Sequence, residues 1–266
     1  MKLLKDILYK VSVNTVYGDT NVKVAQVDFD SRKVVKDSLF VAQIGTSVDG
    51  HLYIDKAIRL GATTIICEEL PIHLEANITF IQVEDSNKTL AIIASNFYDN
   101  PSSKLKLIGV TGTNGKTTVA SLLYQLFKKS GYKTGLLSTV QILVDTTVFN
   151  ATHTTPDSVT INSYLHQMVL LGVDYCFMEV SSHGIHQKRT EGLEFAGGIF
   201  TNLSHDHLDY HVSFASYRDV KKSFFDSLPK TAFALTNLDD KNGNLMLQNT
   251  KARKRTYALK TLAKQI

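Results

Sequence analysis

Residues 109–118 read Gly-Val-Thr-Gly-Thr-Asn-Gly-Lys-Thr-Thr, and this stretch decides the fold class of the 266-residue chain. A buried-strand pattern at 105–110 precedes it, and a helical pattern closed by Gly131 follows it. Glycines here permit a tight turn, in which backbone N–H groups and the helix N-terminus converge on phosphate oxygens. Lys116 would reach the β- and γ-phosphates of a nucleotide, and the Thr117 hydroxyl would bind Mg²⁺. The stretch therefore predicts an ATP or GTP site in an α/β domain.

The glycines of this loop are displaced relative to the general phosphate-loop pattern. That pattern has a glycine five positions before the one at Gly115, where this chain has Val110. Glycines stand at 109 and 112 instead. A glycine-rich turn that binds no ligand is the alternative interpretation. The Lys-Thr-Thr run at the start of the helix favours the nucleotide site.

Strand and helix patterns alternate on both sides of the loop. Strands are predicted at 22–30, 37–45, 63–69, 78–84, 105–110, 133–139, 173–180, 196–203 and 231–238, and helices at 1–10, 51–62, 87–100, 116–130, 158–172 and 213–228. This alternation predicts an N-terminal α/β domain and then a phosphate-loop (P-loop) ATPase domain, whose mainly parallel sheet carries helices on both faces. Because Pro101 stops the preceding helix, the segment 100–103 is the predicted linker, with domains at 1–103 and 104–266.

Composition is that of an ordinary soluble domain pair. The chain is 43% hydrophobic and 20% charged, with a net charge of +4, and no apolar run is long enough to span a membrane. The basic run at 251–260 is interpreted as a solvated segment rather than a nucleic-acid patch. Cys67 and Cys176 lie in apolar strand patterns, which indicates buried free thiols in a reducing compartment. We expect a cytoplasmic monomer with no nucleic-acid partner and no membrane insertion.

Three further stretches follow predicted parallel strands, at the edge where open α/β sheets bind ligands. They read HTTPD at 153–157, MEVSSHG at 178–184 and TNLSHDHLDYH at 201–211. The loop at 109–118 resembles that of the Mur ligases and of the related folylpolyglutamate and cyanophycin synthetases. The three stretches resemble the Mur ligase branch that adds the third amino acid to UDP-MurNAc-L-Ala-D-Glu. Segments at 28–32, 39–42 and 49–51 are similar to the uridine-binding domain of that branch, so the resemblance covers essentially the whole chain.

The resemblance implies an amide-bond ligase that uses ATP and Mg²⁺ to convert a carboxylate into an acyl phosphate. It makes Lys116, Lys221 and His207 catalytic. The metal ligands it implies are Thr117, Glu179, His207 and Lys221. Residues 217–221 resemble the family's Y-x-x-A-K element, with Val220 in place of Ala, and imply a carbamate on Lys221 formed from CO₂. The nucleotide contacts it implies are Gly112, Thr113, Asn114, Gly115, Lys116, Thr117, Thr118 and Asn237.

Substrate contacts are carried over in the same way. UDP-MurNAc-L-Ala-D-Glu and a diamino acid, with meso-diaminopimelate favoured over lysine, are the expected partners. The contacts to the UDP-linked substrate would be Ser31, Thr46, Ser47, Val48, His153, Thr154, Thr155, Ser181, Gln187 and Arg189. A guanidinium such as that of Arg189 suits the anionic groups of this substrate.

The family's C-terminal amino-acid-binding domain has no counterpart in these 266 residues, and the central domain is expected to be incomplete. We therefore expect the chain to bind both substrates without joining the amino acid. Two alternatives stay open: another ligase of the superfamily, such as a folylpolyglutamate synthetase, or a non-catalytic module that binds a UDP-sugar and a nucleotide.

Overall fold

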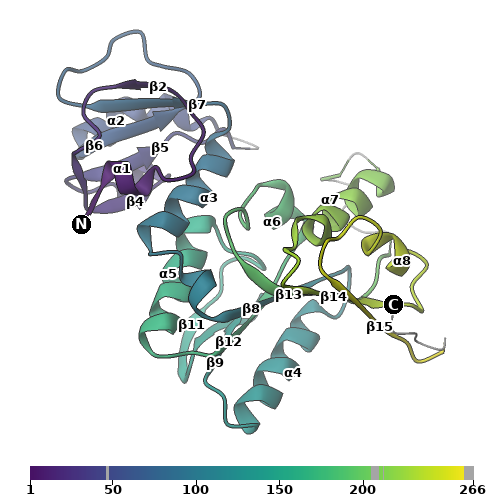
Figure 1. The fold of residues 1–266 in the computed structure, drawn as a ribbon. Helices are drawn as coiled ribbons and strands as arrows, with labels where there is room; N and C mark the ends of the chain where they lie inside the picture. The colour runs from purple at the N-terminus through teal and green to yellow at the C-terminus, as the bar shows by residue number, and fades with distance from the viewer. Residues whose placement is uncertain (46–47, 205–209, 212, 261–266) are drawn as a thin grey trace. The chain divides into compact units, whose positions relative to one another are not determined.

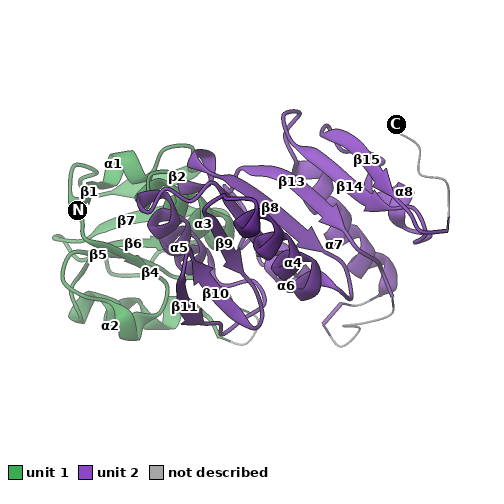
Figure 2. Cartoon of the chain, turned by 90° about the horizontal axis from the view of Figure 1, so that it is seen from below, with its two compact units in different colours: residues 1–100 green, residues 101–266 purple. Residues whose placement is uncertain are grey.

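The computed structural model describes residues 1–45, 48–204, 210–211 and 213–260. The chain divides into two compact units, Met1–Asn100 and Pro101–Ile266 (Figure 2). The expected linker is ordered, because Pro101–Lys104 forms a 3₁₀ helix, η3, in which Pro101 and Ser102 are buried. The division thus falls just before Pro101 and leaves the 3₁₀ helix in the second unit.

The first unit is built on a five-stranded sheet in the order β2-β7-β6-β5-β4 (Figure 1). Neighbouring strands are parallel except for β2, which is antiparallel to β7. The strands are β2 Val13–Tyr17, β4 Gln26–Asp28, β5 Ser38–Val41, β6 Ala62–Cys67 and β7 Thr79–Val83, and β1 Lys2–Leu3 pairs separately with β3 Lys23–Val24. The helices are α1 Leu4–Ile7, α2 Ile54–Arg59 and α3 Ser86–Phe97, with 3₁₀ turns η1 Ser31–Lys33 and η2 Gly50–Tyr53.

The second unit is built on an eight-stranded sheet in the order β11-β10-β9-β12-β8-β13-β14-β15. Its strands are β8 Lys106–Thr111, β9 Thr134–Leu137, β10 Gln141–Val144, β11 Thr147–Asn150, β12 Tyr175–Glu179, β13 Phe195–Phe200, β14 Phe233–Asn237 and β15 Arg253–Tyr257. Neighbouring strands are parallel except that β10 is antiparallel to both β9 and β11. After β8 the chain adds β9 to β12 on one side of that strand and then β13 to β15 on the other, so the strand order reverses at β8. Open α/β sheets bind ligands at such a reversal.

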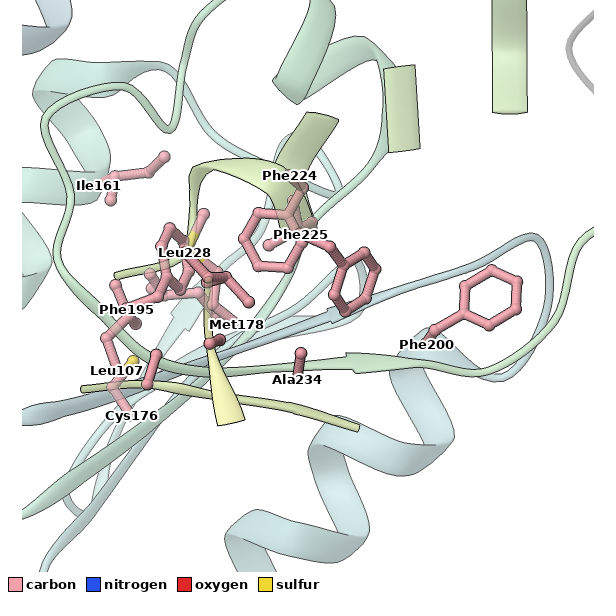
Figure 3. Packing of buried hydrophobic residues seen from close by; sticks show 14 of the residues in the cluster. Leu107, Ile161, Cys176, Met178, Phe195, Phe200, Phe224, Phe225, Leu228 and Ala234 are labelled. Carbon is pink, nitrogen blue, oxygen red and sulfur yellow. The ribbon is translucent and has the colours of Figure 1, made fainter. Parts of the chain in front are cut away.

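Helices cover both faces of this sheet (Figure 1). The helices of the second unit are α4 Lys116–Lys129, α5 Ser158–Leu170, α6 Ser182–His186, α7 Phe214–Ser227 and α8 Gly243–Met246. Alternate strand residues point to opposite faces, so Ile108 packs with α4 while Leu107 belongs to the core beneath α5 and α7. Figure 3 shows Phe224 and Phe225 of α7 in that second core. The predicted fold class, α/β with a mainly parallel sheet covered on both faces, is confirmed.

Several elements differ from the sequence prediction. The predicted first helix shortens to α1 because Lys2–Leu3 pairs as β1. Strand β2, the β10–β11 hairpin and helices α6 and α8 were not predicted. The basic run at 251–260 is not a simple solvated segment, because Arg253–Tyr257 forms β15 and pairs with β14. Its arginine side chains stay exposed, as suits the end of a sheet.

Across the described part of the chain, none of the helices combines the length and apolar character needed to cross a bilayer.

Candidate nucleotide and substrate sites

The loop at 109–118 links β8 to α4 and is fixed by the end of β13. Its backbone turns at Gly112, where φ is +148° and a Cβ atom would lie 2.0 Å from the Thr201 hydroxyl oxygen. Asn202 holds the loop from the same side, accepting from Thr113 N at 2.8 Å and from Asn114 N, through Oδ1, at 3.0 Å. The turn therefore begins at Gly112. Val110 can stand where the general pattern has glycine because it is still a fully buried strand residue.

Helix α4 presents an anion-binding terminus at this loop. Gly115 is its N-cap, with φ +84°, and the first backbone bond of the helix runs from Val119 N to Gly115 O at 2.9 Å. The N–H groups of the first turn point out of the helix end and favour negative charge there. Lys116 lies over the loop, where its Nζ donates to Gly112 O at 3.1 Å and Thr113 O at 2.9 Å. Thr117 is half-buried and Thr118 is exposed.

Helix α7 brings a second lysine to the same carbonyl. The side chain of Lys221 is buried, and its Nζ donates to Gly112 O at 3.0 Å. Its ammonium also lies 4.8 Å from the centroid of the Tyr217 ring, whose hydroxyl is 3.1 Å from the Thr113 hydroxyl oxygen. Lys222 instead pairs along the helix with Asp226 at 2.6 Å. Of the two adjacent lysines, Lys221 is the one that faces the phosphate loop.

Glu179 ends β12 next to the loop, in register with Val110 of β8. Only 1% of Glu179 is exposed. Thr139, just after β9, donates to both carboxylate oxygens, from N to Oε1 at 2.8 Å and from Oγ1 to Oε2 at 3.2 Å. The Thr139 hydroxyl oxygen also lies 3.1 Å from that of Thr154. The carboxylate is thus fixed at the edge of the sheet that carries the phosphate loop.

The predicted substrate residues between β11 and α6 form one network. The Thr155 hydroxyl donates to Glu179 O at 2.9 Å and accepts from Ser181 N at 2.9 Å, and the residue is 1% exposed. Its carbonyl accepts from Arg189 Nη1 at 2.6 Å. The Thr155 hydroxyl therefore links the end of β12 to the start of α6. Ser181 caps α6, because its hydroxyl accepts from Gly184 N at 3.1 Å.

Arg189 is oriented by Gln187. Arg189 donates from Nε and Nη2 to Gln187 Oε1, at 3.0 and 2.6 Å. Burial lowers the pKa of Arg189, and Asp157 opposes that shift. The Tyr210 hydroxyl in turn accepts from Gln187 Nε2 at 3.2 Å and lies 3.0 Å from His186 Nδ1. His153 is exposed beside this network, and its Nδ1 lies 3.0 Å from the Thr152 hydroxyl oxygen.

Asn237, a predicted nucleotide contact, has both ends of its amide engaged within the protein. Its Nδ2 donates to Thr201 O at 3.0 Å and its Oδ1 accepts from Asp239 N at 3.0 Å. Asp240 supports the same loop by accepting from Leu203 N at 2.7 Å. This stretch positions the segment that holds the phosphate loop.

A separate hollow of about 460 Å³ lies in the first unit. Two predicted substrate residues, Ser31 and Val48, line it, while Thr46 and Ser47 lie outside the described residues. Asp30 caps η1, and its paired hydrogen bonds with Arg32 hold the Asp30 pKa down at about 2. The remaining lining residues are Phe29, Asp30, Arg32, Gln43, Gly45, Gly50, Tyr53 and Lys56.

The side chains beside the phosphate loop fit a cation that is bound partly by protein oxygens and partly by phosphate oxygens. Within the described residues no three His, Cys, Asp or Glu side chains gather as a metal cage. Glu179 supplies one buried carboxylate and Thr117 one hydroxyl at the helix start. Mg²⁺ commonly takes one or two carboxylates and completes its shell with water and phosphate oxygens. His207, the other predicted ligand, lies outside the described residues.

Three residues of these networks were missed from the sequence: Thr139, Asn202 and Tyr210. Asn202 and Tyr210 stand inside the TNLSHDHLDYH stretch, so their place in a motif was the available signal. Thr139 has no motif of its own. It reaches Glu179 only because β9 pairs with β12.

Two family profiles match the chain. That of the Mur ligase middle domain matches residues 110–266, and that of the Mur ligase family catalytic domain matches residues 23–98. Curated relatives from Cytophaga hutchinsonii and Phocaeicola vulgatus are 58% and 54% identical, over 98% and 99% of this chain. Both are named UDP-N-acetylmuramoyl-L-alanyl-D-glutamate–2,6-diaminopimelate ligase. The chain spans 54% of each, so it covers about half the length of the curated relatives it matches.

Solved structures agree on the fold. A structure of a UDP-N-acetylmuramoyl-L-alanyl-D-glutamate–2,6-diaminopimelate ligase superposes with a TM-score of 0.80 over 98% of this chain and 53% of that one, at 24% identity. The MurF ligase from Thermotoga maritima, solved in complex with ADP, gives a TM-score of 0.58 at 21% identity, over 89% of this chain and 51% of that one.

Proposed function

Because the chain belongs to the Mur ligase family, we propose that it is the uridine- and ATP-binding part of a ligase that joins meso-diaminopimelate to UDP-MurNAc-L-Ala-D-Glu. The family membership rests on the profile match over 110–266, and the proposed substrates are those in the names of the curated relatives. The same names favour diaminopimelate over lysine as the amino acid.

One observation carries the proposal. Two lysines from different helices, Lys116 and Lys221, converge on the Gly112 carbonyl at the N-terminus of α4, and the buried carboxylate of Glu179 ends a neighbouring strand. Cations and a helix terminus suit the transferring phosphoryl group, and a lone buried carboxylate suits Mg²⁺ held between protein and phosphate. The ADP complex of a ligase with this fold supports nucleotide binding.

The proposed reaction has two steps. A carboxylate oxygen of the dipeptide attacks the γ-phosphorus of ATP, the bond to the β,γ-bridging oxygen breaks, and ADP leaves. The amine of the amino acid then attacks the acyl carbon, loses a proton, and expels phosphate. Bound Mg²⁺ would neutralise charge on the phosphate oxygens.

The chain's own groups orient these reactants. Lys116 would turn from the loop carbonyls to the phosphates, and the N–H groups at the start of α4 would bind phosphate oxygens. Arg189, held by Gln187 and the Thr155 carbonyl, would pair with an anionic group of the UDP-linked substrate. Ser31 and Val48 would contact the uridine end in the hollow of the first unit.

Lys221 is proposed to carry a carbamate. In that step the neutral amine nitrogen bonds to the carbon of CO₂ and one proton is released. The product is an anion that can bind Mg²⁺, which an ammonium cannot do. The orientation of Lys221 towards the loop, and of Lys222 away from it, supports the assignment.

A second candidate is a non-catalytic module that binds a UDP-sugar and a nucleotide, since the hollow of the first unit and the phosphate loop would serve such binding as well. A folylpolyglutamate synthetase is less well supported, because the first unit itself matches a Mur ligase profile at 23–98.

Titration calorimetry tests the binding half of the proposal, with Mg·ADP and UDP-MurNAc-L-Ala-D-Glu as ligands. Both should bind, and Lys116→Ala should lower ADP affinity at least tenfold while the fold persists, because one phosphate-neutralising charge is lost. Unchanged ADP affinity in a folded Lys116→Ala protein would reject the nucleotide site.

Mass spectrometry after incubation with ATP, the UDP-linked substrate and diaminopimelate tests ligation. Binding of both substrates without product is the outcome expected of this chain, and a product heavier by one diaminopimelate residue would contradict that expectation and support a complete ligase site within these residues.

A further inference from the structure

Glu179 is held by a residue to which no role has yet been given. We propose that Thr139 is a positioning residue, which fixes both oxygens of the Glu179 carboxylate so that their outer lone pairs face a divalent cation. The inference rests on the proposed function, since it takes Glu179 as a ligand of the nucleotide-bound cation. It adds a residue outside every motif that the sequence offers.

The strand pairing brings the two residues together. Strand β9 lies parallel to β12, and Leu137 is the register partner of Met178, so the chain beyond β9 passes beside Glu179. There Thr139 donates twice, from its N–H to Oε1 at 2.8 Å and from its hydroxyl to Oε2 at 3.2 Å. One donor from the backbone and one from the side chain fix the plane of the carboxylate.

The turn that carries Thr139 is itself rigid. Ser138 N donates to Gln141 O at 3.2 Å, and the Ser138 hydroxyl donates to the same carbonyl at 2.8 Å. Gln141 N returns a bond to the Ser138 hydroxyl oxygen at 3.3 Å. Because Ser138 is buried and bonded on both sides, the backbone at Thr139 is set before any ligand arrives.

The arrangement leaves the carboxylate ready for a cation. An ionised carboxylate offers about four lone-pair sites, and Thr139 uses one on each oxygen. The remaining sites share the plane that the two bonds impose. Such supporting hydrogen bonds typically contribute about 10- to 100-fold to metal affinity, because they hold the ligand in its binding orientation.

Thr139 also links this carboxylate to the segment that precedes α5. Its hydroxyl oxygen lies 3.1 Å from that of Thr154, which we propose as a substrate contact. A single side chain thus joins the groups proposed to meet the metal and the UDP-linked substrate.

The test measures Mn²⁺ binding to the ADP complex by electron paramagnetic resonance. Thr139→Val keeps the backbone donor and the shape of the side chain but removes the hydroxyl, so the Mn²⁺ affinity should fall about tenfold. Thr139→Ser should restore it, and ADP affinity measured without metal should stay the same. Thr147→Val is the matched control, since it makes the same change at an exposed position on β11 of the same sheet.

Glu179→Gln separates failure of this inference from failure of the proposed site. If Glu179→Gln loses Mn²⁺ affinity while Thr139→Val and Thr139→Ala both bind Mn²⁺ like the wild type, Thr139 does not position the carboxylate. If Glu179→Gln itself binds normally, the carboxylate is no ligand, and the proposed metal site falls together with this inference. Amide NMR spectra would establish that each variant is folded.

Discussion

Two adjacent lysines on α7 are both buried but have different partners, although their sequence context is almost the same. Lys221 is buried and donates to the Gly112 carbonyl, whereas Lys222 pairs with Asp226 one turn along the helix. An α-helix separates consecutive side chains by about 100°, so only one of the two can face the phosphate loop. The chemistry proposed for this helix therefore depends on a single position.

We predict a carbamate on Lys221 and none on Lys222. With ¹³C-labelled bicarbonate, the wild type and Lys222→Ala should each give a carbamate signal in the carbon NMR spectrum, and Lys221→Ala should give none. The reason is that a carbamate at 221 would be buried beside the loop, where Mg²⁺ can stabilise it. A signal that survives Lys221→Ala and disappears in Lys222→Ala would reverse the assignment.

Both cysteines are buried free thiols. Burial raises the pKa of Cys67 to about 11, and it also raises the pKa of Cys176. The thiolate is the reactive form, so at pH 8 only about one Cys67 in a thousand is ionised in the native state. Native protein should therefore react very slowly with a disulfide reagent between pH 7 and 9, and both thiols should react at once in guanidinium.

The same shift makes a prediction about stability. Because the folded pKa of Cys67 lies above its unfolded value, the neutral thiol favours the folded state fully below about pH 8.5, and this contribution is lost as the pH rises towards 11. Cys67→Ala should make the alkaline loss of stability smaller in urea titrations between pH 8 and 11, and the part caused by Cys176 should remain. Rapid labelling of native thiols at pH 8 would contradict the burial on which both expectations depend.

At the scale of elements, helix caps connect the fold to the site. Asp157 is the N-cap of α5, where it accepts from Thr160 N at 2.9 Å and from the Thr160 hydroxyl at 2.7 Å. The same carboxylate also raises the pKa of Arg189, against the lowering that burial causes. Asp157 thus caps the N-terminus of α5 and also contributes to the electrostatic potential at Arg189, a proposed substrate contact.

Asp157→Ala should lower the free energy of unfolding by about 1 kcal/mol, because the first turn of α5 loses its acceptor. Asp157→Asn keeps an acceptor at the N-cap and should cost less, while it removes the charge near Arg189. Urea unfolding measures the first effect, and affinity for the UDP-linked substrate measures the second. Equal destabilisation by both substitutions would show that the charge, rather than the cap, stabilises the helix.

The elements that could be predicted from the sequence are those whose local residue pattern alone determines their structure. Strand β8, the glycine turn and α4 each carry their own signal, so the phosphate loop could be located in advance. The β10–β11 hairpin could not, because its turn depends on Asp145 adopting φ +54°, and β15 could not, because Arg253, Lys254 and Arg255 gave its segment a solvated pattern. In both cases pairing with another strand decides the structure.

The candidate site divides in the same way. Lys116, Glu179 and Arg189 stand in the stretches that carry the family resemblance, which made them candidates from the sequence. The residues that hold these side chains in place could not be predicted. Thr139 reaches Glu179, and Tyr210 reaches Gln187, only through contacts between segments far apart in the sequence. For Thr155 and Asn237 the sequence was misleading in another way. Their motifs assigned these side chains to ligand binding, but in the structure the side chains bond to the protein itself.

At the scale of the whole molecule, the chain carries two candidate sites, each lined by residues of one unit. The 460 Å³ hollow uses only residues of Met1–Asn100, and the phosphate loop and its supports use only residues of the second unit. Each unit also has its own buried core. We therefore predict that UDP and ADP bind to this chain independently of each other.

Two substitutions test this independence. Ser31→Ala removes a hydroxyl from the hollow and should weaken UDP binding about fivefold, since a lost hydrogen bond costs roughly 1 kcal/mol, while ADP affinity stays the same. Lys116→Ala should weaken ADP binding and leave UDP affinity unchanged. In the double variant the UDP affinity should match that of Ser31→Ala and the ADP affinity that of Lys116→Ala, each to within about 0.5 kcal/mol, because the substituted residues belong to different units. Calorimetry with each nucleotide, alone and with the other present, measures all of these quantities. A fall in UDP affinity on Lys116→Ala, or a change in UDP affinity when ADP is bound, would mean that the two sites are coupled.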